Sequence, residues 1–194
     1  MTQASGKAGT AMDEPTSVAE AFSRVPERNT GDALLRTAQQ HHVALSSMAD
    51  TKANIIITVS SIVLTLTLAR INDPSFRTSA ITLTVFTLLA LLVAILAVLP
   101  KYRPLKLKDG EPLPANFNLL FFGHFAELPR DRFLTEISRN MQPNAIYETM
   151  AKDLYSLGYY LAHYKYRYLR VAYLFFLSGF VLASVEQLFV LASS

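Results

Sequence analysis

Apolar residues gather into three long runs along the chain, and these runs predict three membrane-spanning helices. The first run covers residues 53–69 without a single charged side chain. A helix of that length rises about 25 Å, close to the thickness of a thin hydrocarbon core. The second run, 79–99, is also uncharged and ends at Pro100, and the third covers 171–191. We therefore predict transmembrane helices at 53–70, 79–99 and 171–191.

Polar segments with a helical period lead into two of these spans. Residues three or four apart share one face of a helix. One such row precedes the first span and consists of His42, Ser46, Asp50 and Asn54. A similar seam precedes the third span and consists of Leu154, Leu157, Leu161, Lys165 and Tyr168. We expect both helices to continue into the membrane without a break.

The remaining segments differ in composition. Residues 1–30 are rich in Thr, Ser, Ala, Gly, Glu and Pro with no apolar period, which predicts a disordered tail. A helix outside the membrane is expected over 31–52. The insert at 101–168 begins with a proline-rich stretch and continues through an aromatic patch at 118–125. A short amphipathic helix follows Pro129, and the long helix that enters the third span follows it.

Composition and charge position favour a membrane protein and predict its orientation. Only 17% of the residues are charged and 51% are hydrophobic, whereas a soluble domain has about a quarter charged. A basic cluster directly follows the second span: Lys101, Arg103, Lys106 and Lys108. Cationic loops remain in the cytoplasm, so we expect the N-terminus and 101–168 to be cytoplasmic and the C-terminus periplasmic. The predicted fold class is an all-α membrane protein with three transmembrane helices, two of them continuous with long cytoplasmic helices, plus a small cytoplasmic insert.

The residue inventory argues against catalysis. The chain contains no cysteine, which excludes disulfides, cysteine nucleophiles and thiolate metal sites. His41 and His42 are adjacent, so on a helix they point in different directions and do not form a metal pair. A phosphate-binding glycine loop and a nucleophile elbow are both missing from the sequence. We predict that the protein is not an enzyme and uses no metal or cofactor, and the net charge of +3 does not argue for nucleic acid.

Polar and aromatic side chains near the membrane could instead form a site for a small, planar anion. Such a ligand needs an aromatic face, groups that read its edge and cations for its phosphate. The candidate ligand-binding residues are Asp50, Asn54, Phe122, His124, Asp153, Lys165 and Arg170. Each type occurs more often in a core or on a solvated surface, so this assignment is a hypothesis from chemistry alone.

Two further residues are candidates for coupling to the membrane. Lys52 lies at the entry to the first span, and Glu186 lies within the third. Glu186 shares one face with Ala172, Gly179 and Ala183, and an ionisable residue on such a face is often functional. Two interpretations stay open: Glu186 points into the helix bundle, or it is close enough to the outer surface to be wetted.

Three short segments carry a resemblance to a known family. They are Met48-Ala49-Asp50-Thr51-Lys52-Ala53-Asn54, the stretch 118–125, and Asp153-Leu154-Tyr155-Ser156-Leu157-Gly158 followed by Lys165-Tyr166 and Leu169-Arg170. Together they are similar to the transmembrane effectors of Pycsar, the bacterial pyrimidine-cyclase anti-phage defence. The resemblance covers roughly residues 31–190.

The resemblance implies a function that the residues alone do not. A cognate cyclase would make cyclic CMP or cyclic UMP during infection, and the effector would bind it and impair the bacterial inner membrane, causing abortive infection. The implied partners are this nucleotide and membrane lipid. Our own hypothesis is that the chain is a homo-oligomer whose subunits assemble or re-pack their spans when the nucleotide binds. Two alternatives stay open: a three-span scaffold that binds no nucleotide, and a transporter or channel subunit with Glu186 in an ion path.

Overall fold

The computed structural model describes residues 29–99, 111–143 and 145–193. Within these ranges about 83% of the residues are helical and none form strands. Three helices are long and apolar enough to cross a membrane, which confirms the predicted all-α membrane fold. Most of the predicted tail (1–30) and the basic cluster (101–108) used to predict the orientation lie outside the described residues.

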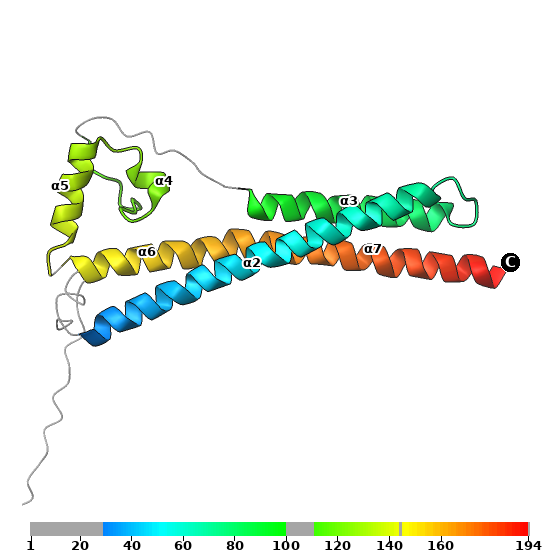
Figure 1. Ribbon diagram of the computed structural model, residues 1–194, viewed down its shortest axis with the longest axis horizontal. Coiled ribbons are helices and arrows are strands. Elements are labelled where there is room, and N and C mark those ends of the chain that lie inside the picture. The colour runs from blue at the N-terminus through cyan, green and yellow to red at the C-terminus, as the bar shows by residue number, and fades with distance from the viewer. Residues whose placement is uncertain (1–28, 100–110, 144, 194) are drawn as a thin grey trace, which may run out of the picture.

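The three long helices lie side by side (Figure 1). The first, α2 (Asn29–Arg70), runs through both its polar and its apolar half without interruption. A short turn connects it to α3 (Arg77–Val98), which carries no charged side chain after Arg77. The third is built from α6 (Ile146–Tyr160), a π-helical turn η1 (Leu161–Lys165) and α7 (Tyr166–Ser193). Two of the three spans thus continue into long helices that extend beyond the end of α3.

Small side chains form the contact between the spans. The buried residues of α3 are Ala80, Thr87, Ala90, Ala94 and Ala97. Small residues allow helix backbones to approach closely, which favours association in lipid, where no hydrophobic force drives helices together. Ala94 of α3 packs with Ile56 of α2 and Ala172 of α7, so one cluster joins all three spans.

The polar half of the molecule carries residues 111–143, the described part of the predicted insert that precedes α6, and from here on the insert means this part. Two short helices, α4 (Phe122–Phe125) and α5 (Arg130–Asn140), lie beside the first turns of α6 and away from α7 (Figure 1). The Phe125 and Phe133 rings have centroids 5.1 Å apart and join the two helices. The insert therefore rests on the part of the third long helix that extends out of the apolar bundle.

Candidate functional site

A charged pair joins α2 to the third long helix just outside the apolar bundle. Lys165 Nζ donates hydrogen bonds to Asp50 Oδ2 at 2.7 Å and to Ser46 Oγ at 2.9 Å. The Lys165 side chain is only 9% exposed, whereas that of Asp50 is 43% exposed. The structure thus brings together two of the predicted site residues. Burial and the negative charge of Asp50 raise the pKa of the neighbouring Tyr160.

Lys165 lies at the end of a π-helical turn. Leu161 and Lys165 begin and end η1, and both are buried. A π-turn inserts an extra residue into the helical repeat, which shifts every later side chain around the axis relative to a regular α-helix. Such turns are frequent at functional sites. Sequence periodicity offered no signal for this turn.

The polar row on α2 faces the third long helix along most of its length. His42 packs against Gly158, where an added Cβ would lie 3.0 Å from His42 Nε2. The next two members, Ser46 and Asp50, both accept hydrogen bonds from Lys165. Asn54 is exposed and takes no part in this contact. The row is therefore mainly a contact between two helices of one chain.

A second polar network joins the insert to both long helices. Asp153 accepts a hydrogen bond from Asn118 Nδ2 at 2.8 Å and another from Gln39 Nε2 at 3.2 Å. The backbone N–H of Asn118 donates to His124 Nδ1 at 2.9 Å. Asp153 and His124 were predicted as site residues, and the structure connects them through Asn118. Sequence reasoning missed Asn118 and Gln39, although Asn118 opens the aromatic patch that it singled out.

Two aromatic rings pack against the half-buried His124 imidazole. The Phe121 ring meets it edge-on with centroids 5.2 Å apart, and the Phe117 ring lies 5.4 Å away. Burial lowers the pKa of His124. Because Nδ1 accepts the Asn118 N–H, the ring must be neutral and carry its proton on Nε2.

Acidification is expected to loosen this end of the insert. The pKa of His124 is lower in the folded chain than in the unfolded chain, so the unfolded chain binds the proton more readily. The contribution of His124 to the free energy of unfolding is therefore complete above about pH 6.5 and falls as the pH drops below that value. The thermal midpoint should therefore fall between about pH 7.5 and 5.5. Replacing His124 with Asn keeps an acceptor but removes the titration, so the His124→Asn chain should lose part of this pH dependence. An identical pH dependence in both chains would contradict the role assigned to His124.

Two clefts lie between the start of the insert and α6. One has a volume of about 240 Å³ and is lined by Asn140, Thr149 and Lys152, among others. The other has a volume of about 360 Å³ and lies beside Lys152 and Glu148. Phe117 and Asn118 line both clefts. The Lys152 ammonium forms an exposed ion pair with Glu148 at 2.8 Å.

Four predicted site residues lie outside both networks of side-chain hydrogen bonds, and the exposed Asn54 is one of them. Arg170 and Lys52 are exposed near the ends of their spans. Phe122 is 65% exposed and meets the Phe121 ring at 5.0 Å between centroids. These residues lie outside the clefts because of the side of the helix that each one occupies. The type of a residue does not predict that side.

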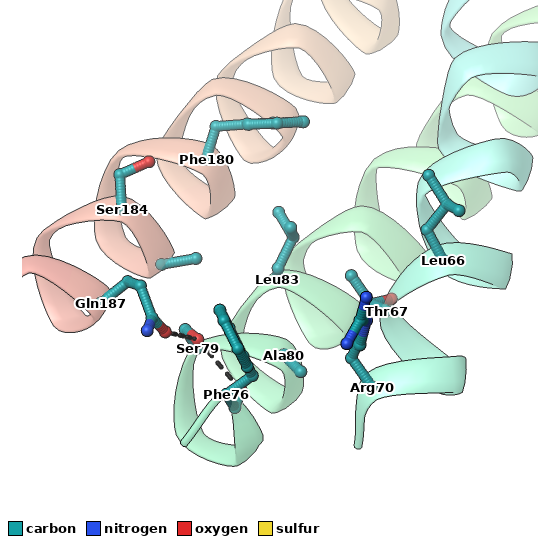
Figure 2. Close-up of a pocket in the computed structure, with 11 residues that line it drawn as sticks. Leu66, Thr67, Arg70, Phe76, Ser79, Ala80, Leu83, Phe180, Ser184 and Gln187 are labelled. Atoms are coloured by element: carbon teal, nitrogen blue, oxygen red, sulfur yellow. Dashed lines mark hydrogen bonds between the residues drawn. The ribbon is translucent and has the colours of Figure 1, made fainter. Parts of the chain in front are cut away.

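Glu186 contacts the neighbouring span. Its Oε1 accepts a hydrogen bond from Thr82 Oγ1 of α3 at 3.0 Å, so the side chain points into the bundle. Its Oε2 is buried and has no hydrogen-bond partner among the described residues. The next residue, Gln187, accepts a hydrogen bond from Ser79 at 2.8 Å and lines a pocket of about 340 Å³ at this end of the bundle (Figure 2).

The arrangement defines a class of protein: a three-span membrane protein whose first and third helices extend into a polar domain and hold a small insert. Residues 33–192 match the family described as the Pycsar effector protein domain. The chain belongs to this family and is a membrane effector of anti-phage defence. No curated protein and no solved structure matches it.

Proposed function

We propose that this chain is activated by a cyclic pyrimidine nucleotide, cyclic UMP or cyclic CMP, which a cognate cyclase supplies during infection. Activation impairs the bacterial inner membrane and causes abortive infection. The protein acts as a homo-oligomer in lipid, without catalysis, metal or cofactor. Its N-terminus and residues 101–168 are cytoplasmic and its C-terminus is periplasmic. The observation that carries the proposal is the family match over nearly the whole described chain.

The cleft between the insert and α6 is the best candidate for the nucleotide site. Ligand pockets start at about 300 Å³, and a cleft of about 360 Å³ therefore suits a single-ring nucleotide. Phe117 offers an aromatic face, Asn118 is an amide that could read a base edge, and Lys152 offers a cation for the phosphate. This placement replaces Lys165 and Arg170 as the proposed phosphate-binding cations.

The second polar network offers a path from that cleft to the membrane. Asn118 lines the cleft and donates to Asp153 of α6, which also binds Gln39 of α2. A ligand that moves Asn118 would therefore change how the two long helices are held together. It can shift this equilibrium only by its difference in affinity for the two arrangements. The Lys165–Asp50 pair further along the same helices favours the resting arrangement.

Calorimetry on the detergent-solubilised chain tests the proposal. We expect one of the two cyclic pyrimidine nucleotides to bind and cyclic AMP and cyclic GMP to give no heat. A hydrogen bond to a charged group contributes about 1.5–3 kcal/mol, so Lys152→Ala should weaken binding about tenfold or more. Lys152 is largely exposed, so this substitution should leave the fold intact.

The matched control removes another exposed cation of the insert region. Arg139 pairs with Glu136 in a similar exposed contact and lines neither cleft. Arg139→Ala should bind the nucleotide like the unmodified chain. Equal affinity of the Lys152→Ala chain would contradict the proposed site. Growth and membrane potential that are unaffected by co-expression with an active pyrimidine cyclase would contradict the proposed function as a whole.

A further inference from the structure

A stripe of residues, all of them exposed except the half-buried Ala38, runs along one face of α2 from Leu34 to Leu66. Its members recur at alternating spacings of three and four, the heptad pattern that places residues on one side of a helix. In the polar half of α2 the apolar members include Leu34, Leu45 and Met48, which are 70%, 39% and 48% exposed. We call this face the α2 stripe.

The same stripe continues into the membrane span. Ile55, Val59 and Ile62 occupy the next positions in the same register and are also exposed. The polar and apolar halves of α2 meet near Ala49 and Ala53, where Leu169 and Val98 pack. Lipid covers the stripe beyond that point. Before it, water would meet Leu34, Leu45 and Met48, which is costly for large apolar side chains.

We infer that the occupant of the α2 stripe is the α2 stripe of a second copy of this chain. Copies inserted in one membrane share one orientation, so their α2 helices are parallel and their stripes lie at the same height. The stripe is about 50 Å long at 1.5 Å per residue. That is more than four heptads, and three to four heptads are enough for a coiled coil.

Other occupants fit this face less well. The insert helices lie beside α6 (Figure 1). Residues 1–28 have no apolar period that could match a heptad stripe. The two polar members of the stripe, His41 and Lys52, are both exposed. A single polar residue at a seam position sets register between like helices at some cost in stability. Lys52 also lies at the membrane boundary, where its ammonium can reach the headgroups.

This inference deepens the proposed function by assigning a surface to the proposed homo-oligomer, and it rests on that part of the proposal. It does not involve the proposed nucleotide cleft, because none of the residues that line the cleft belongs to α2. Contact between copies before infection would keep the effectors assembled. A small rearrangement of the long helices within each chain would then change an oligomer that already exists.

Cysteine cross-linking in native membranes tests the inference. The chain has no cysteine of its own, so each introduced thiol is unique. Leu45→Cys and Met48→Cys place a thiol on the stripe, and Val43→Cys places one on the opposite face of the same helix, where Val43 is 57% exposed. With copper–phenanthroline as oxidant, we expect disulfide-linked dimers for the two stripe variants and monomers for Val43→Cys. A disulfide between equivalent residues requires Cα atoms within about 7 Å, which a parallel, in-register pair provides.

The outcomes separate this inference from the nucleotide proposal. Maleimide labelling shows that each thiol is accessible in a folded chain. Labelled stripe variants that form no dimers, or dimers of Val43→Cys in equal yield, would overturn the inference. The experiment is run without a cyclase, so dimers of the stripe variants support the inference even where calorimetry finds no nucleotide binding.

Discussion

Replacing Lys165 with methionine should make the effector active without a cyclase. The substitution removes the donor to Asp50 and Ser46, leaving the half-exposed Asp50 carboxylate without its cation. Loss of a hydrogen bond between charged groups costs about 1.5–3 kcal/mol, and the exposure of Asp50 puts the expected loss at the low end. A change of about 1.4 kcal/mol raises the population of a minor state tenfold. Growth arrest and loss of membrane potential on expression of the variant alone are the measurements.

The control for Lys165→Met is Arg167→Met. Arg167 is a cation two residues further along the same helix and is exposed. The Arg167→Met substitution should leave growth unchanged. The combination of Asp50→Lys with Lys165→Asp restores an opposite-charge pair and should reduce the arrest. If Lys165→Met cells instead grow normally and the purified chain no longer binds nucleotide, Lys165 is a phosphate ligand rather than a contact between helices.

Replacing Gly179 with alanine should separate α3 from α7. A Cβ at this position would lie 2.6 Å from Phe86 Cβ, an atom held by the α3 backbone that cannot move aside as a flexible side-chain end could. Overpacking of this kind costs about 1–3 kcal/mol. We expect a lower thermal midpoint in detergent and faster proteolysis of the hairpin between α2 and α3.

Gly158, earlier in the same long helix, and the adjacent Ser178 provide the comparison. A Cβ at Gly158 would lie 3.0 Å from His42 Nε2, the far end of a side chain that can rotate away, so Gly158→Ala should cost less. Ser178 is exposed next to Gly179, so Ser178→Ala should be nearly neutral. A Gly179→Ala chain as stable as the Ser178→Ala chain would show that α3 and α7 do not pack this closely.

Several candidate residues could be found from the sequence, but their roles could not. Asp50 and Asn54 fall in one row at spacing four, yet Asp50 binds Lys165 while Asn54 is exposed. Spacing shows that residues share a face of one helix. It does not show which neighbour that face meets. Glu186 is a similar case, because its contact with Thr82 depends on how α3 packs against α7.

The sequence by itself determined the three spans and the all-α class. Both follow from local properties, since a long uncharged run must enter lipid as a helix that satisfies its own backbone groups. It also determined that two spans continue into polar helices, because the helical period crosses the membrane boundary without a break. Only the tertiary structure decided which polar residues meet. The Lys165–Asp50 pair depends on how α2 packs against the third long helix, and the buried position of Asn118 between Asp153 and His124 depends on where the insert rests on α6. These contacts join residues far apart in the chain, and their energies come from packing that no local pattern records.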